Sequence, residues 1–193
     1  QYNKQYYKIH RLELLEYSKK YNRENYQKKK IKVFKMISKN NIKCISCNLK
    51  DVRVLQINHK NGDGHIEMNG LNYYSFFNSI INGKRTVSDL DLRCANCNIL
   101  YEFECGRRGF GVSWKGLAAF ATIRRHKTIQ KLGGECVDCH IKDMRLLQIN
   151  HIKYGGNKER KSIGQKLYTK ILNGNCKNYD VRCANHNILY GYS

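Results

Sequence analysis

The sequence predicts an α+β protein made of two tandem copies of one small module, preceded by a long, basic, helical N-terminal arm. Three observations predict it. A pattern of a cysteine pair, an apolar run ending in histidine, and a second cysteine-containing pair occurs twice along the 193 residues. Each copy has roughly sixty residues, a size at which apolar burial alone is marginal and a metal or disulfide staple is common. The first 41 residues contain neither proline nor glycine, which favours a helix.

The internal repeat keeps its spacing between the two copies. Fifteen residues separate Cys44 from His59, and fifteen separate Cys136 from His151. Ten of the sixteen positions in these two segments are identical. A repeat of this quality indicates a duplicated structural unit, so the same chemistry is expected in both halves.

The pattern along the chain divides it into four parts. We expect a basic helical arm at 1–41, a first module at 42–105, a Gly/Arg linker with a helix at 106–133, and a second module at 134–193. The arm should be one long helix or two, ending near Asn40. Within the first module we expect a strand at 52–57, a core helix at 71–81 and a helix opening at Cys94; in the linker part, we expect a helix at 114–132.

The charge of the chain indicates a polyanionic partner. Lys and Arg number 36 against 15 Asp and Glu, which gives a net charge of +21. A nucleic-acid backbone, of DNA or RNA, is the partner that best explains this excess together with the fourteen interleaved tyrosines. The alternatives are a merely solvated basic surface and an anionic membrane surface. The sequence shows no lipid anchor and no apolar run long enough to cross a bilayer, so we expect no membrane partner.

The cysteine pairs predict two structural zinc ions. Both side chains of a C-x-x-C knuckle can reach one tetrahedral ion, and a second pair completes four ligands. The second copy has a histidine where the first has its fourth cysteine, an exchange that zinc tolerates and a disulfide does not. Thiols kept for metal suggest an intracellular, reducing compartment such as cytoplasm, nucleoid or organelle matrix. The predicted ligand sets are Cys44, Cys47, Cys94 and Cys97 in the first copy, and Cys136, Cys139, Cys183 and His186 in the second.

The ordered set of motifs resembles the HNH, or His-Me finger, nucleases, and most closely their endonuclease VII-like branch. That branch shows C-x-x-C, an acidic residue followed by histidine, and C-x-x-C-Asn. Here the corresponding positions are Asn58-His59 followed by Asn98, and Asn150-His151 followed by Asn187. The resemblance covers about two thirds of the chain. It implies a ββα fold for each zinc-stabilised module.

The resemblance also implies a metal-dependent endonuclease. His59 and His151 would be the general bases that activate water against a phosphodiester. One magnesium ion per module would be held by the residue before the histidine and by the distal asparagine. These tentative magnesium ligands are Asn58 with Asn98, and Asn150 with Asn187. Our own inference adds Arg93 and Arg182, one residue before a zinc ligand, as phosphate contacts.

Both copies depart from the family at the acidic position, where each has asparagine. Magnesium is a hard cation that favours anionic oxygen ligands, so two neutral amides make a weak site. Two interpretations follow. In the first, the modules cleave, and the substrate phosphate supplies the anionic ligand. In the second, they are inactive and serve as an RNA-binding subunit among other components of a ribonucleoprotein such as a ribosome.

Overall fold

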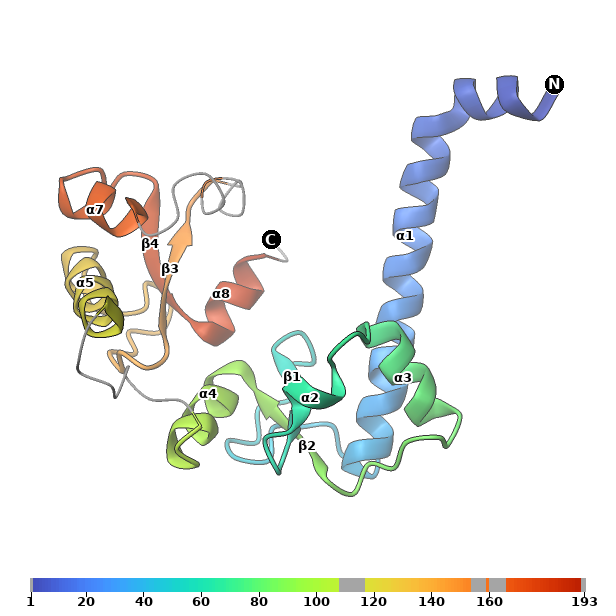
Figure 1. Ribbon diagram of the computed structural model, residues 1–193, viewed down its shortest axis with the longest axis horizontal. Coiled ribbons are helices and arrows are strands. Elements are labelled where there is room, and N and C mark those ends of the chain that lie inside the picture. The colour runs from blue at the N-terminus through green and yellow to red at the C-terminus, as the bar shows by residue number, and fades with distance from the viewer. Residues whose placement is uncertain (1, 108–116, 154–158, 160–165, 192–193) are drawn as a thin grey trace. The chain divides into compact units, whose positions relative to one another are not determined.

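The computed structural model describes residues 2–107, 117–153, 159 and 166–191 (Figure 1). The protein is α+β, as predicted, with helices that outweigh two small two-stranded sheets. The strands are β1 (Leu55–His59), β2 (Leu90–Cys94), β3 (Leu147–His151) and β4 (Tyr179–Cys183). The helices are α1 (Tyr2–Ser38), α2 (Gly64–Glu67), α3 (Tyr73–Ile81), α4 (Ala95–Glu104), α5 (Leu117–Lys131), α7 (Lys166–Leu172) and α8 (Ala184–Tyr190). Within the described residues, no helix is both long and apolar enough to cross a membrane.

Contacts divide the chain into two compact units. The first comprises Gln1–Ile42 and Ile57–Leu92, and the second comprises Lys43–Gln56 and Arg93–Ser193. The boundaries drawn above at 42–105 and 134–193 follow the repeat rather than contacts, and they stay a prediction. Most of the expected linker, 108–116, lies outside the described residues, as does the start of the helix expected at 114–132.

The first unit is built on the packing of α1 against α3. The sequence places Val33 on the inner face of α1, where it is fully buried against Phe76, Phe77 and Ile80 of α3. Lys29 belongs to the same contact, because its Nζ donates to Asn78 Oδ1 at 2.6 Å. The C-terminal part of the basic arm is therefore a core element, while its N-terminal part is exposed.

Local hydrogen bonds set the ends of these two helices. After α1, Lys39 and Asn40 adopt positive φ angles of 50° and 68°, and Asn40 N–H donates to the carbonyl of Lys35 at 2.9 Å. Asparagine tolerates this left-handed conformation, so the helix ends where the sequence predicted. The Asn72 side chain accepts from Ser75 N–H at 2.8 Å, which starts α3 at Tyr73, two residues later than expected.

The strands form two hairpins that follow the same turn. Arg53 N–H donates to the Asp51 carboxylate at 3.0 Å, and Arg145 N–H donates to Asp143 in the same way at 3.0 Å. This aspartate turn occupies the residues expected to open the first strand, so β1 begins at Leu55 instead of 52. β1 pairs with β2, and β3 pairs antiparallel with β4, with Asn150 directly opposite Asp180.

The core of the second unit joins both repeats. Ile129 from α5 is fully buried beside Leu147 of β3 and Val181 of β4. Ile99 and Leu100 of α4, which belong to the first repeat, pack against this cluster. The helix that follows the first repeat's second cysteine pair is thereby fixed to the second repeat.

α4 and α8 cap each other at their first turns. Asn96 N–H donates to Asn185 Oδ1 at 3.1 Å, and Asn185 N–H donates to Asn96 Oδ1 at 3.0 Å. These N–H groups lie in the first turn of a helix, where no backbone partner exists within the helix itself. The reciprocal pair satisfies both and holds the two helix starts together.

We expect loss of either asparagine to destabilise the second unit. Asn96→Ala and Asn185→Ala should each lower the free energy of unfolding by about 1 kcal/mol, because each leaves one first-turn N–H unbonded. The double variant should cost less than the sum, since either loss lets the helices separate. Urea unfolding of the four proteins measures this. Asn22→Ala, on the exposed face of α1, is the control; costs no larger than its own would contradict the prediction.

Candidate metal centres and hairpin histidines

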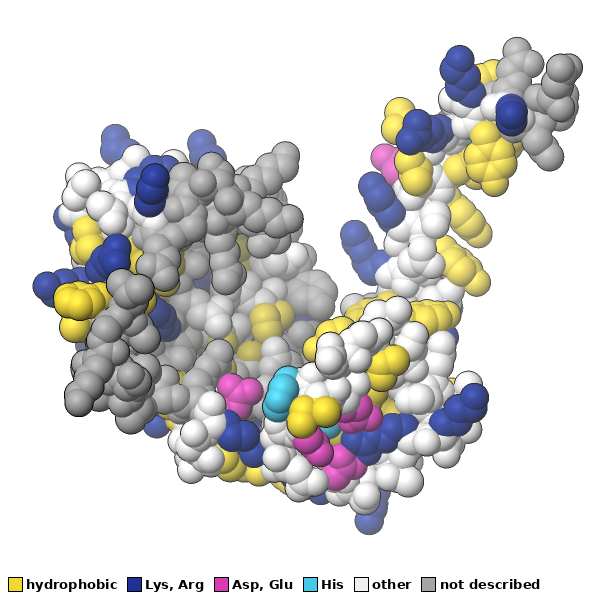
Figure 2. Space-filling model, in the orientation of Figure 1, with side chains coloured by type: hydrophobic (Ala, Val, Ile, Leu, Met, Phe, Trp, Pro, Cys, Tyr) yellow, Lys and Arg dark blue, Asp and Glu magenta, His cyan; other side chains and the backbone are white. Residues whose placement is uncertain are grey.

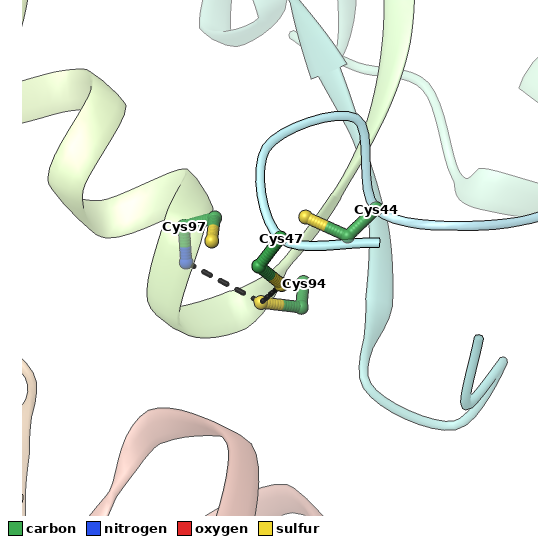
Figure 3. A group of neighbouring side chains, drawn as sticks. All are labelled: Cys44, Cys47, Cys94 and Cys97. Atoms are coloured by element: carbon green, nitrogen blue, oxygen red, sulfur yellow. Dashed lines mark hydrogen bonds between the residues drawn. The ribbon is translucent and has the colours of Figure 1, made fainter. Parts of the chain in front are cut away.

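The first tetrad consists of Cys44, Cys47, Cys94 and Cys97, and its sulfurs converge on one point (Figure 3). Two come from the knuckle before β1, one from the end of β2 and one from the first turn of α4. All four ligand atoms lie within 4.8 Å of one another, and the Sγ atoms of Cys47 and Cys94 are 3.7 Å apart. A tetrahedral ion with metal–sulfur bonds of about 2.3 Å requires sulfur–sulfur separations of about 3.8 Å. The tetrad has that size, and its cysteines are free thiols.

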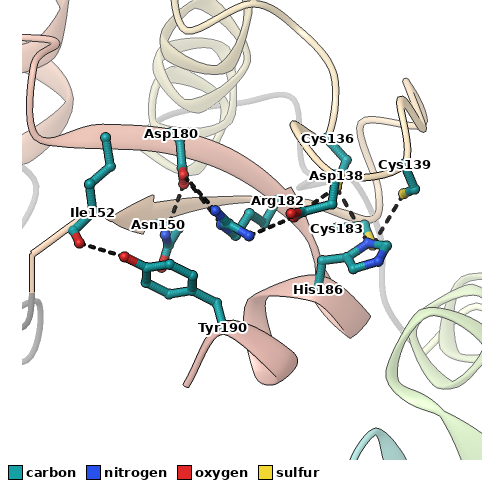
Figure 4. A network of polar contacts seen from close by, with 10 residues as sticks. All are labelled: Cys136, Asp138, Cys139, Asn150, Ile152, Asp180, Arg182, Cys183, His186 and Tyr190. Atoms are coloured by element: carbon teal, nitrogen blue, oxygen red, sulfur yellow. Dashed lines mark hydrogen bonds and ion pairs between the residues drawn. The ribbon is translucent and has the colours of Figure 1, made fainter. Parts of the chain in front are cut away.

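The second tetrad consists of Cys136, Cys139, Cys183 and His186 and has the same size (Figure 4). The Sγ atoms of Cys139 and Cys183 are 3.8 Å apart, and His186 Nδ1 lies 3.6 Å from Cys136 Sγ and 3.2 Å from Cys183 Sγ. An edge between a sulfur and an imidazole nitrogen in such a site is about 3.6 Å. The two tetrads therefore fit two structural metal ions such as zinc, with Nδ1 as the ligand atom of His186.

Both knuckles turn back in the same way after their second cysteine. Asn48 and His140 have φ angles of 62° and 58°, and each donates its N–H to the carbonyl of the knuckle's first cysteine at 2.9 Å. Asparagine and histidine are among the residues that tolerate this left-handed conformation. His140 is exposed and hydrogen-bonds Glu135 through Nδ1 at 3.1 Å, and it is not part of the tetrad.

The thiols of the tetrads need a cation before all can ionise. Burial raises the pKa of Cys97 well above its usual range, and burial together with its neighbours raises the pKa of Cys139 to about 12. Burial also raises the pKa of Cys44, but N–H groups of Cys94, Cys47 and Ser46 outweigh it and lower that pKa to about 7. A divalent ion offsets the cost of the remaining thiolates, and its binding releases protons.

We expect two bound zinc ions per chain and one after loss of a ligand. Cys136→Ser should retain one ion, because three ligands hold zinc weakly, whereas His186→Cys should retain both. Elemental mass spectrometry gives the stoichiometry, and circular dichroism should show unfolding on chelation. Cys105→Ser, at an exposed thiol outside both tetrads, is the control and should keep two ions. A metal-free chain with oxidised cysteines would refute the assignment.

The hairpin histidines, His59 and His151, are the last residues of β1 and β3. Each lies against a glutamate eight residues further along the chain. His59 Nε2 is 2.8 Å from Glu67 Oε2, and His151 Nε2 is 3.0 Å from Glu159 Oε2. The histidine side chains are 10% and 17% exposed. The same side-chain pair thus recurs at the same place in both repeats.

Different cations hold the two glutamates. Arg85 binds both oxygens of Glu67, at 2.8 Å each, and also contacts Asp89. Hydrogen bonds from Arg85 lower the pKa of Glu67, with a smaller contribution from His59. Around Glu159 the donors are Lys170 Nζ at 2.6 Å and Tyr179 Oη at 2.7 Å, and Lys170 is the main cause that lowers the pKa of Glu159.

The lowered pKa of Glu67 makes its contribution to stability depend on pH. A carboxyl group whose pKa falls on folding stabilises the protein above its unfolded pKa, and this stabilisation is lost as the pH falls through the folded pKa. Glu67→Gln should therefore cost about 1–2 kcal/mol at neutral pH. The difference from the parent should shrink below about pH 4.3, the usual glutamate value.

Urea unfolding of the parent and of Glu67→Gln at each pH measures the difference in their free energies of unfolding. Any loss of metal at low pH affects both proteins alike and cancels in this difference. Glu16→Gln, at an exposed position of α1, is the matched control and should show little difference at any pH. A cost of Glu67→Gln that stays constant down to pH 3 would rule out the carboxylate as its source.

The four asparagines expected to bind magnesium each use their amide NH₂ on a neighbour. Asn58 and Asn150 are buried and donate to Asp91 at 2.9 Å and to Asp180 at 2.8 Å. Asn98 donates to Gln56 at 3.1 Å, and Asn187 donates to Gln148 at 2.6 Å. Among the described residues, the groups of His, Cys, Asp and Glu able to hold a metal are the two tetrads. A neutral amide set is poor for magnesium, because this hard cation favours anionic oxygen ligands.

The two arginines expected to contact phosphate have protein partners. Arg93 donates to Ser46 Oγ at 2.7 Å, and its guanidinium lies 3.7 Å from the Tyr101 ring centroid. Figure 4 shows Arg182 between two carboxylates, with Asp138 at 2.6 Å and Asp180 at 3.1 Å. A phosphate at Arg182 would compete with these carboxylates. Both arginines stabilise the knuckle and hairpin next to their tetrads.

Three pairs of polar residues around these sites escaped the sequence analysis. They are Glu67 with Glu159, Asp91 with Asp180, and Gln56 with Gln148. The two members of each pair occupy equivalent positions of the two repeats, at the same number of residues from a predicted site residue. Aligning the repeats would therefore have pointed to them. No protein-family model, curated protein or solved structure matches the chain.

Proposed function

We propose that the protein is a nucleic-acid-binding zinc protein whose two repeats are ββα modules of the His-Me finger, or HNH, type that hydrolyse phosphodiester bonds. The observation that carries the proposal is the duplicated hairpin histidine, which ends the first strand in each repeat and is held through Nε2 by a glutamate. In each repeat a tetrad of metal ligands joins the start of one hairpin strand to the end of the other.

The proposed chemistry needs one proton acceptor at the hairpin. The imidazole Nδ1 of a hairpin histidine takes a proton from water as the water oxygen attacks phosphorus. The bond from phosphorus to the leaving ester oxygen breaks, and this oxygen keeps the electron pair and takes a proton from solvent. The products are a hydroxyl end and a phosphate monoester. The tetrads take no part, because four protein ligands leave no position for substrate.

The surface of α1 supports nucleic acid as the substrate class. Figure 2 shows Lys and Arg side chains and exposed apolar side chains along this helix, in a chain of net charge +21. Tyr17 and Tyr21 are 69% and 56% exposed and stack on each other at 6.3 Å between ring centroids. Cations that follow a phosphate chain and aromatic rings that stack on bases are the two elements of sequence-tolerant nucleic-acid binding.

A specific observation favours a second candidate, a non-catalytic RNA-binding subunit of a ribonucleoprotein. The residue before each hairpin histidine is a buried asparagine engaged by an aspartate, and Arg182 is already paired with two carboxylates. In this reading the networks stabilise the hairpins, and the basic surface alone binds the polyanion.

Cleavage assays separate the two candidates. With supercoiled plasmid or a structured RNA, in the presence of magnesium or manganese, the zinc-loaded protein should cleave. His59→Ala/His151→Ala should lose at least about 100-fold in rate, the usual contribution of a general base, while its affinity for the nucleic acid is unchanged. Affinity should fall steeply with salt in both proteins.

His65→Ala is the matched control, because His65 is an exposed histidine of α2 that belongs to neither tetrad. Its cleavage rate should equal that of the parent. Salt-sensitive binding without cleavage by the parent protein would select the ribonucleoprotein candidate.

A further inference from the structure

The histidine–glutamate pair is one part of the hairpin environment that both repeats share. Glu67 and Glu159 each lie eight residues after the histidine and bind its Nε2 through Oε2. The groups that neutralise them differ, since Arg85 serves Glu67, whereas Lys170 and Tyr179 serve Glu159. The contact between the glutamate carboxylate and the histidine Nε2 is therefore the same in both repeats, although the groups that bind the glutamate differ.

The ionisation of the glutamates decides which histidine nitrogen carries the proton. Hydrogen bonds from Arg85 lower the pKa of Glu67, and Lys170 lowers the pKa of Glu159, so both carboxylates are ionised at neutral pH. An ionised carboxylate accepts hydrogen bonds and donates none. Nε2 must therefore donate, and in a neutral ring the lone pair is then on Nδ1.

The backbone of Gly64 lies close to Nδ1 in the first repeat. A Cβ atom added at Gly64 would lie 2.5 Å from His59 Nδ1 and 3.0 Å from its Cγ. No side chain fits there without moving the ring. Gly64 also begins α2, the single helical turn that returns the chain so that Glu67 meets Nε2. One short segment thus supplies the carboxylate at Nε2 and the glycine whose missing side chain lets the ring keep its position.

From this geometry we infer that Glu67 and Glu159 are positioning residues, which hold His59 and His151 as Nε2–H tautomers so that Nδ1 accepts the proton from water. The inference rests on the proposed function for the role of Nδ1, but the tautomer itself can be observed without cleavage. Partners that fix the tautomer and orientation of a metal-ligating imidazole typically contribute about 10- to 100-fold to activity, and we expect an effect of the same order here.

The tautomer is read from the ¹⁵N resonances of the histidine rings of the zinc-loaded full chain. His59 and His151, assigned from the spectra of His59→Ala and His151→Ala, should each show a protonated Nε2 and an unprotonated Nδ1 at neutral pH. Glu67→Ala should turn the His59 signals into an average of the two tautomers and leave those of His151 unchanged. Asp89→Asn, which alters the same Arg85 network without touching the histidine, should keep the single tautomer.

The catalytic consequence is measured with one active repeat at a time. In a His151→Ala background, Glu67→Ala should lower the cleavage rate about 10- to 100-fold with unchanged affinity for nucleic acid. Glu67→Gln retains an oxygen acceptor and should recover part of the rate. Gly64→Ala should lower the rate as well, because its methyl group displaces the ring from its position. Glu159→Ala in a His59→Ala background provides the same test for the second repeat.

The outcomes separate the inference from the proposed function. Averaged tautomers in the parent, or a Glu67→Ala spectrum identical to that of the parent, would overturn the inference whether or not the protein cleaves. A changed tautomer with an unchanged cleavage rate would also overturn it. A single tautomer that depends on Glu67, in a protein without cleavage activity, would support the positioning and overturn the nuclease. If Glu67→Ala fails to fold, Glu159→Ala gives the same readings on His151 in the second repeat.

Discussion

The convergence of four ligands, at the spacing of a tetrahedral metal site, is the constraint on which each repeat depends. Each tetrad draws two ligands from a knuckle before the first strand and two from the junction of the second strand with a helix. These segments are far apart in the sequence, and the hairpin between them is only five residues long on each strand. A two-stranded hairpin is marginal by itself. Closing the tetrad brings the strand ends together, so metal affinity becomes folding free energy.

The metal sites also organise the helices beyond them. Cys94 and Cys183 end a strand, supply a ligand, and stand at the N-cap of α4 and α8. The next turn of each helix supplies the fourth ligand, Cys97 or His186, and also the asparagine that caps the other helix. Ligand geometry and the contact between repeats therefore share the same four residues at the start of each helix, Cys94 to Cys97 and Cys183 to His186. Disruption of one tetrad should destabilise the first turns of both α4 and α8, because the reciprocal hydrogen bonds between Asn96 and Asn185 require both helix starts in position.

The duplicated sequence made the tetrads predictable but left the hairpin contacts undetermined. Ligand residues, the fold class and the helix after Cys94 could be read from spacing, because chemistry permits few alternatives there. The strands β2 and β4 were not predicted, although Leu90–Cys94 and Tyr179–Cys183 alternate apolar and polar residues as a strand does; only the helix that opens at Cys94 was expected there. The start of β1 depends on the hydrogen bond from the Arg53 N–H to the Asp51 side chain, which forms a turn before the strand. The strand preferences of individual residues do not predict this turn. Burial of the basic arm on α3 likewise depends on partners distant in sequence.

The comparison between repeats distinguishes what the hairpin site requires from what merely supports it. The glutamate beside the histidine is bound by the Arg85 guanidinium in the first repeat and by the Lys170 ammonium and the Tyr179 hydroxyl in the second. In both repeats the glutamate carboxylate contacts Nε2 of the histidine. Around the asparagine, an aspartate accepts from the amide in both. A hairpin that needed only stability could use apolar residues at these positions. The free energy lost when buried polar groups are desolvated is about as large as the free energy gained from their hydrogen bonds. Both copies keep an imidazole whose Nε2 is bound by a carboxylate, and the proposed role of Nδ1 depends on that shared contact.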